Sequence, residues 1–484
     1  MLFFISACTV GPDYRRPEVA VPAAYKEEAG WRKARPADAI DRGAWWSVFR
    51  DPVLDGLARQ IEISNQNLKA AEAAFRQAEA IVAQSRAGFF PTAQVNATAQ
   101  RSRSPGSGSI ANSFSVTGSA SWVPDLWGRV RRTVESDVAS AQASTGDLAG
   151  ARLAAQGQLA GAYLQLRVAD ELKRLLDSAV KAYGESLRIS QNQYNAGIAA
   201  ASDVAQARTQ LDSTQARAIA VGVSRAQLEH AIAVLIGKAP AELTIAPAST
   251  VPPLPDIPAG LPSTLLERRP DIAAAERRMA AANATIGVAE TAFFPDVALS
   301  ADAGVMAATL ARLLSASSRL WSFGSTLSQT VFDAGARHAQ VDQARAAFDA
   351  TVAGYRQNVL TGFQQVEDQL AALRILAEQA AAQDRAVASS REAERIIFNQ
   401  YRAGTVAFTN VVVAQTAALG NAEAALSVRQ SRLSAAVALI QALGGGWNAA
   451  QLPSRERIES DAPLNFSPLP PADAGPKLSP WNGR

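Results

Sequence analysis

The feature that most constrains the fold is residues 128–195, whose pattern is that of one uninterrupted helix. At about 1.5 Å of rise per residue, such a helix would be about 100 Å long. Its apolar residues, among them Val130, Val134 and Val138, recur at steps of three and four and form a narrow seam typical of a coiled coil. Residues 337–401 repeat the same rhythm. The sequence therefore predicts two very long helices, which few soluble folds can use.

The similarity between the two halves of the chain extends beyond these helices. Three short motifs occur twice, and the second copy lies 204 to 208 positions after the first. The pairs are Gly88-Phe89-Phe90-Pro91 with Ala292-Phe293-Phe294-Pro295, Asp125-Leu126-Trp127-Gly128-Arg129 with Asp333-Ala334-Gly335-Ala336-Arg337, and Tyr194-Asn195-Ala196-Gly197 with Tyr401-Arg402-Ala403-Gly404. We therefore expect two tandem copies of one unit, residues 51–237 and 271–443.

Each copy is predicted to contain a helix, a β-hairpin, the long helix and a shorter return helix. In the first copy these are a helix over about 52–87, a hairpin at 92–122, the long helix at 128–195 and a return helix at 201–236. In the second copy, a helix from 271 precedes a hairpin at 296–332, a long helix at 337–401 and a return helix at 410–443. The two shorter helices of a copy should stack end to end beside the long one. A Pro-rich connector, 238–270, and a C-terminal tail, 444–484, are expected to wrap the outside of the body near its middle.

Composition excludes several classes of function. The chain has 484 residues, 48% hydrophobic and 19% charged, with a formal net charge of +3, so nucleic acid is not an implied partner. One cysteine and two histidines, His230 and His338, give no basis for a disulfide, a zinc site or a histidine-based triad. We predict no metal, no cofactor and no catalytic residues. Because the sequence has no run of 18 apolar residues, strands are the expected means of entering a membrane.

The start of the chain resembles a bacterial lipoprotein processing site. Apolar and small residues lead into Cys8, the single cysteine, which would be acylated and become the new N-terminus. Thr9, which follows it, resembles the residue found in lipoproteins sorted to the outer membrane. The alternative for Cys8 is an incidental buried thiol. Residues 1–8 are thus interpreted as a signal remnant, and 9–50 as an extended arm over the folded body.

The two predicted hairpins alternate with period two. Polar and apolar side chains take opposite faces, as Val116 and Thr117 illustrate, and the apolar residues are mostly small. Strands of about ten residues with this pattern are typical of membrane β-barrels. The residues predicted to face a water-filled lumen are Thr117, Ser119, Ser121 and Ser300. A soluble, half-buried sheet is the alternative, and it would favour larger apolar residues. Four strands cannot close a barrel, whereas three copies would supply about twelve.

The chain resembles the TolC-like outer-membrane factors, and among them the lipoproteins that serve resistance-nodulation-division efflux pumps. The stretches that carry the resemblance are Cys8-Thr9-Val10-Gly11-Pro12-Asp13-Tyr14, Trp45-Trp46 with Asp51-Pro52-Val53-Leu54, the connector segment 261–272, and Ala442-Leu443-Gly444-Gly445-Gly446-Trp447. They span nearly the whole chain in the order and at the spacing of that family.

The resemblance implies a homotrimer in the outer membrane of a Gram-negative bacterium. Its fold would be mainly α, with a twelve-stranded membrane β-barrel continued by an α-helical barrel across the periplasm. The helical tip would meet a periplasmic adaptor and, through it, the inner-membrane pump. Such a protein is an exit duct that passively conducts small molecules, such as drugs or toxic compounds, and it has no catalytic site.

The resemblance also places candidate contacts and gates. The adaptor would meet the two tips, at Gly197, Ile198, Gly404, Thr405 and Val406. The position that is acidic at the gate of the family falls on Val413 in the second copy, with Thr409 four residues earlier, and Asp203 is the nearest carboxylate in the first copy. Asp203 could instead cap a helix or lie on the surface. A ring of Val413 side chains could gate by dewetting.

Three alternatives remain at this stage. The duct could serve type I protein secretion or metal efflux. The sequence has only three methionines and two histidines, and this small number of copper-binding residues weakly disfavours a dedicated copper route. A structural trimeric coiled-coil protein would explain the long helices but not two alternating hairpins. An enzyme would require a nucleophile, a metal cluster or a phosphate-binding loop, and the sequence offers none of them.

Overall fold

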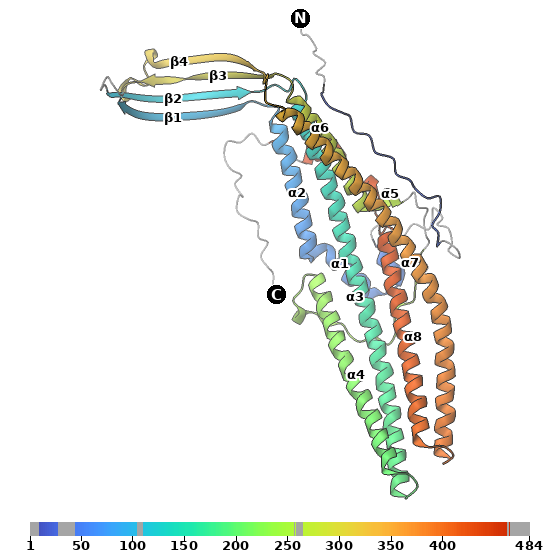
Figure 1. Ribbon diagram of the computed structural model, residues 1–484. Coiled ribbons are helices and arrows are strands. Elements are labelled where there is room, and N and C mark those ends of the chain that lie inside the picture. The colour runs from blue at the N-terminus through green and yellow to red at the C-terminus, as the bar shows by residue number, and fades with distance from the viewer. Residues whose placement is uncertain are drawn as a thin grey trace.

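The computed structural model describes residues 9–27, 44–103, 110–255, 257, 265–461 and 464. An elongated body of helices carries a four-stranded sheet at one end, and two helical turns lie together at the other end (Figure 1). The two copies are built alike. The long helices α3 (Arg129–Asn195) and α7 (Ala336–Arg402) have 67 residues each, and the return helices α4 (Ala201–Leu235) and α8 (Phe408–Ala442) have 35 each. The bounds lie within two residues of those expected from the sequence.

The strands form one antiparallel sheet in the order β1-β2-β3-β4. Their bounds are Thr92–Arg103 for β1, Ile110–Trp122 for β2, Asp296–Ala307 for β3 and Arg319–Ser328 for β4. The second hairpin is shorter than expected, because β4 ends at Ser328 rather than near residue 332. Gln329 instead donates from its side-chain Nε2 to the carbonyl oxygen of Phe293, at 3.1 Å. Within the protomer, β1 and β4 are the two edges of the sheet.

The helix expected over residues 52–87 is in fact two helices, α1 (Pro52–Ser64) and α2 (Gln66–Ala87). Asn65 separates them. Its side chain accepts from Leu68 N, which caps α2, and donates to Leu235 O at 2.6 Å, which satisfies a terminal carbonyl of α4. The end of α4 therefore abuts the break between α1 and α2.

The second copy makes an equivalent junction by other means. Its short helices are α5 (Leu265–Arg268) and α6 (Pro270–Thr291), so part of the expected connector 238–270 is helical. Arg269, between them, donates to Ala442 O at the end of α8 at 3.1 Å and to Gln365 Oε1 at 2.8 Å. In each copy the shorter helices thus stack end to end beside the long one.

The tail does not stay near the middle of the body. It contains the short helix α9 (Arg455–Asp461), whose Ile458 is buried against Val82, Val134 and Val138. These partners lie in the halves of α2 and α3 nearer the sheet. The expectation of a tail confined to the equator is therefore wrong for residues 455–461; most of the rest of 462–484 lies outside the described residues.

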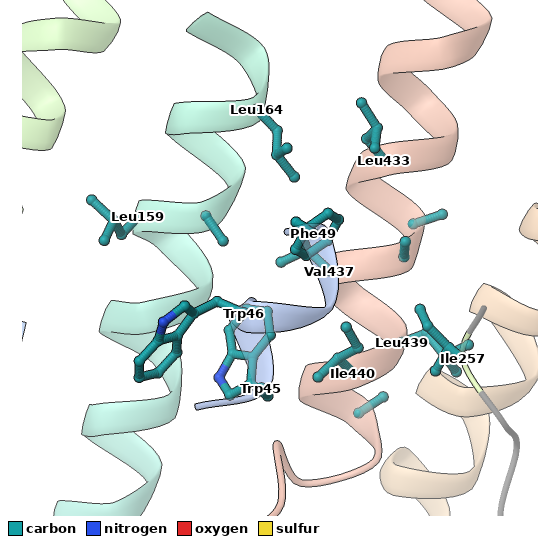
Figure 2. Close-up of a cluster of buried hydrophobic side chains, with 14 of the residues drawn as sticks. Trp45, Trp46, Phe49, Leu159, Leu164, Ile257, Leu433, Val437, Leu439 and Ile440 are labelled. Carbon is teal, nitrogen blue, oxygen red and sulfur yellow. The ribbon is translucent and has the colours of Figure 1, made fainter. Parts of the chain in front are cut away.

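The main core lies where the short helices meet. The 3-10 helix η1 (Trp45–Phe49) inserts its two tryptophans and Phe49 between α3 and α8 (Figure 2). Trp45 donates from its indole nitrogen to Gln156 Oε1 at 3.0 Å, so its one polar atom is satisfied in the interior. Burial of these rings joins the first copy to the second and fixes the spacing of the helices at this level.

The N-terminal arm runs extended along the helices as far as residue 27. Arg132, a buried side chain of α3, donates to Val10 O, Gly11 O and Asp13 Oδ1. Further along, the Tyr14 hydroxyl donates to Glu276 Oε1 at 2.7 Å, and Arg16 donates to the Tyr355 hydroxyl at 2.8 Å. The arm is thereby held to α3, α6 and α7 by specific polar contacts.

Two helices, α4 and α8, are long and apolar enough over part of their length to cross a membrane by composition alone. The expectation that no helix meets this criterion overlooked their many alanines. α4 packs along α3 and α8 along α7 (Figure 1), and little of the apolar window of α4 is buried in the protomer.

Candidate conduit and docking tips

The register of the sheet sorts its side chains onto two faces. Residues directly opposite in an antiparallel pair point to the same side, so one row contains Gln94, Ser119, Asp302 and Ser322. The adjacent row contains Thr92, Ser121, Ser300 and Gly324. Thr117, opposite Asn96 and Gly304, lies on this same polar face. The structure therefore brings the four strand residues singled out in the sequence, Thr117, Ser119, Ser121 and Ser300, onto one continuous face.

The opposite face of the sheet is apolar and exposed in the protomer. Its members include Val95, Val116, Leu299, Ala301, Trp321 and Phe323. Trp321 is 81% exposed, a degree that a soluble sheet would not leave for a tryptophan. A sheet with one polar face and one apolar face that nothing covers fits a wall between lipid and water.

The two tips are helical turns at the end of the body opposite the sheet (Figure 1). Gly197 and Gly404 adopt φ of 73° and 75°, the left-handed conformation that ends a helix at little cost only for glycine. The amides that follow them fold back, since Ile198 N donates to Gln193 O at 2.8 Å and Thr405 N donates to Gln400 O at 3.0 Å. Ile198 is 75% exposed, so an apolar side chain projects from the first tip.

The second tip has its own small core. Tyr401 and Phe408 pack with ring centroids 5.2 Å apart, and Val406 is half-buried against them. The Tyr401 hydroxyl lies 3.0 Å from Ser190 Oγ of α3, which links the two tips. Burial raises the pKa of the Tyr401 hydroxyl, and the nearby charge of Asp203 also raises it, against the opposing effect of the Ser190 hydrogen bond. Val406 is thus less available to a partner than Thr405.

The three gate candidates lie in the first turns of the return helices. Asp203 is half-buried in the first turn of α4, whose N-cap residue is Ala200, and it lies close enough to Tyr401 to influence it. Thr409 donates to Gln206 Oε1 across the gap between α8 and α4, at 3.4 Å. Val413, one turn further along α8, is 65% exposed.

Sequence reasoning missed a row of polar contacts between the two return helices. Beyond the Thr409 contact, Gln210 of α4 donates to Thr416 of α8 at 3.2 Å, and Arg217 pairs with Glu423. Partners in this row are 203 to 206 positions apart, close to the repeat spacing, because they face each other across the duplicated unit. The repeat offset could have suggested the pairing, but the facing surfaces emerge only from packing.

The residues that the structure describes contain no group of three or more His, Cys, Asp or Glu that could hold a metal ion. Cys8 lies outside the described residues. Of the residues that follow it, Val10 N donates to Trp127 O at 3.1 Å, and Thr9 packs on Gly128, at the base of the sheet.

Comparison with known proteins places this arrangement in a family. The model of the outer membrane efflux protein family matches residues 57–238 and 261–445, which correspond to the two copies. The chain is 32% identical over 455 residues to the probable efflux pump outer membrane protein TtgC of Pseudomonas putida, covering 92% of this chain and 94% of that protein. It is 31% identical over 453 residues to outer membrane protein OprJ of Pseudomonas aeruginosa, at 92% and 94% coverage.

Solved structures agree with the sequence comparison. The outer-membrane channel OprN superposes with a TM-score of 0.83 at 32% identity, over 91% of this chain and all of that chain. The open state of the MtrE outer membrane channel of Neisseria gonorrhoeae superposes with a TM-score of 0.80 at 27% identity, over 91% of this chain and 99% of that chain. This chain therefore belongs to the outer membrane efflux protein family and is an outer-membrane exit duct.

Proposed function

We propose that three copies of this chain close their sheets into a twelve-stranded barrel, and that their helix pairs continue it as a helical barrel into the periplasm. The observation that carries the proposal is the pair of open edges. β1 and β4 present unpaired backbone groups, and the sheet between them has one polar and one apolar face. Exposed edges in hydrocarbon would leave backbone groups unsatisfied, and pairing β4 with β1 of a neighbour removes them.

The polar face would line the lumen, with Thr117, Ser119, Ser121 and Ser300 in the wall. Solutes would then cross the outer membrane without entering lipid. The relatives' names include efflux pumps for antibiotics, toluene and solvents, which supports small organic compounds as the substrate class. The names of these relatives do not mention protein secretion or metal ions.

The tips would dock a periplasmic adaptor that connects the duct to an inner-membrane resistance-nodulation-division pump. Ile198 and Thr405 are exposed at adjacent turns, and Gly197 and Gly404 beside them have no side chain to obstruct a partner. Helical hairpins of a partner could therefore approach closely. Constriction of the lumen would involve Val413, Thr409 and Asp203, which lie near these tips on the return helices.

Closure of the barrel can be tested by disulfide trapping. Full pairing of β4 with β1 of a neighbour, with polar faces matched, places Gly324 opposite either Asn96 or Thr98. We expect Gly324→Cys combined with one of Asn96→Cys or Thr98→Cys to give covalent trimers, while each single variant does not. Within one protomer two strands separate β1 from β4, which puts them about 14 Å apart, too far for a disulfide. Failure of both pairs to cross-link in the outer membrane would refute the closed trimer.

A further inference from the structure

The ionisable residues of the sheet are segregated by face. On the polar face, the ionisable residues of the described strands are Asp296 and Asp302, both acidic. On the apolar face they are Arg101, Arg103 and Arg319, all basic. Arginine on the lipid side of a barrel wall is costly near the middle of the bilayer and tolerated only near an interface. These three positions therefore require a specific location or a partner.

All three arginines lie near the strand ends that are farthest from the helices, and Figure 1 shows this end of the sheet. β1 enters from α2 and ends at Arg103, and β4 begins at Arg319 after the second turn. With the helices in the periplasm, this end faces the outer leaflet. The arginines thus lie just above the apolar band, at the level of lipid headgroups.

In the single protomer, Arg319 lies on the opposite edge of the sheet from Arg101 and Arg103. Closure of the proposed barrel brings the two edges together. If all ten residues of β4 pair with β1 of the neighbour, the partner of Arg319 is residue 101, 102 or 103. Residue 102 is excluded, because the apolar faces of both strands must point outward and the residues on these faces have odd numbers on β1 and on β4. Arg319 must then lie directly opposite Arg101 or Arg103.

Such a seam cannot neutralise itself. Like charges directly opposite across a ladder are destabilising. The sequence has no Asp or Glu from residue 91 to 124 or from 303 to 332, so neither hairpin supplies a carboxylate at this end. Asp302, the nearest acidic residue on the strands, belongs to the other face. The arginines of the seam need an anion from outside the protein.

The connection between β3 and β4 indicates that this anion is carried by a lipid. Leu310 and Leu314 are 67% and 86% exposed there, and Arg312 lies between them with its side chain also exposed. Trp321, the next outward residue of β4 after Arg319, is likewise exposed. Apolar side chains interleaved with arginine suit a ligand that has both acyl chains and a charged headgroup.

We propose that Arg101 and Arg103 of one subunit and Arg319 of the next, here called the seam arginine cluster, bind the phosphate groups of an outer-leaflet glycolipid. The inference rests on the proposed trimer, which would contain three such clusters. Guanidinium groups bind phosphate in a bidentate manner, and each cation adds to the attraction of an anionic headgroup. The bound lipid would seal the subunit seams at the membrane surface and counter the repulsion across them.

The test is native mass spectrometry of purified trimers incubated with lipid A carrying both phosphates, and with the same lipid after dephosphorylation. The test variant is Arg101→Gln/Arg103→Gln/Arg319→Gln. A matched control, Arg208→Gln/Arg356→Gln/Arg385→Gln, removes the same charge from exposed positions of the helical body. A lysine version of the seam variant retains the charge, and Arg319→Gln alone covers the case in which the triple variant fails to assemble.

We expect wild type and the body control to retain phosphorylated lipid A, and the seam variant to retain at least about tenfold less. Dephosphorylated lipid A should be retained weakly and equally by all. Equal retention by the seam variant and wild type, or indifference to the phosphates, would overturn the proposal. Displacement by inorganic phosphate alone would show a site for soluble anions and also overturn it. The same spectra report the oligomer: a wild-type trimer without lipid refutes only this inference, whereas a monomer refutes the proposed channel as well.

Discussion

Gly237 illustrates how one residue can determine the junction of two elements. It adopts φ of 68° just after α4, and a Cβ there would lie 2.1 Å from the Ser64 carbonyl oxygen. We expect Gly237→Ala to destabilise the protein by about 2 kcal/mol or more, since it combines a left-handed alanine with a backbone clash. Thermal unfolding followed by circular dichroism would measure this.

Gly222→Ala is the matched control for that substitution. Gly222 is exposed within α4, and a Cβ there meets nothing within 4 Å. Alanine should therefore raise stability by about 0.5 to 1 kcal/mol through helix propensity. If both substitutions had the same effect, the junction at Ser64 would not constrain the fold.

Glu394 predicts a pH dependence. It lines a small cavity between α3, α7 and α8, where burial raises the pKa of its carboxyl while Arg391 opposes the shift. A raised folded-state pKa means that the folded protein binds this proton more tightly. Stability then falls as pH rises from the ordinary pKa of glutamate to the raised value. We expect Glu394→Gln to raise the melting temperature at neutral pH and to reduce this dependence.

Glu392 on the same helix supplies the opposite case. A hydrogen bond from Arg395 holds the pKa of its carboxyl below the usual value. Its contribution is therefore present above the ordinary pKa and lost as pH falls through the lowered one. Glu392→Gln should not raise the melting temperature at neutral pH. An increase equal to that of Glu394→Gln would assign the effect to net charge rather than burial.

At the scale of elements, the strands predict a contrast between neighbouring positions. Leu299 lies six residues nearer the helices than Val305, the residue opposite Arg319. Leu299→Lys places a charge on the apolar face and should cost about 2 to 4 kcal/mol if it lies near the bilayer midplane. Ser300→Lys, one residue on, places the same charge on the polar face and should be tolerated. Yield of outer-membrane trimers on semi-native gels would measure both. Equal assembly of the two variants would contradict the assignment of faces.

The tips predict a partner contact. Photo-reactive residues at Ile198 and Thr405 should capture a periplasmic adaptor in cells, to be identified by mass spectrometry. Ile219, exposed in the middle of α4, provides the control position. Adaptor capture at Ile219 but not at either tip would place docking on the flank of the helices. Self-capture alone at the tips would favour a pore that works without an adaptor.

The elements differ in how far the sequence predicts them. The long helices were predictable because the spacing of three and four persists over many turns. The break at Asn65 was not, because an asparagine among Ala, Gln and Glu leaves that spacing intact; its role depends on Leu235 O of a distant helix. α9 was missed for a similar reason, since one buried residue, Ile458, holds it. In the candidate site, the two faces of the strands were predictable from the alternation of polar and apolar residues. The contacts between α4 and α8 were not, because they depend on how the helices pack.

At the scale of the whole molecule, the two copies are joined differently along their length. At the level of η1 they share a dense aromatic core (Figure 2). Towards the tips, α3 with α4 and α7 with α8 form two hairpins. Two small apolar clusters, buried hydrogen bonds such as that of the Tyr183 hydroxyl to Gln415 O, and an exposed polar row between α4 and α8 join them. An exposed polar link contributes little stability, typically below about 1 kcal/mol, so the apolar clusters carry most of the attachment. Separation of the hairpins near the tips would have to open these clusters, but not the aromatic core.

The ion pair between Arg217 and Glu423 is the charged member of that link and allows a decisive test. Its loss should favour separation of the hairpins and so raise passive uptake of a large antibiotic, measured as increased sensitivity of cells. Arg217→Glu alone should have this effect, and the exchange Arg217→Glu/Glu423→Arg should reverse it. Glu185→Arg breaks a more exposed pair within α3, with Arg188, and should leave uptake unchanged. If the exchange variant stayed as sensitive as Arg217→Glu, the pair would not control the spacing of the hairpins, because restoring the attraction would have restored the closed arrangement.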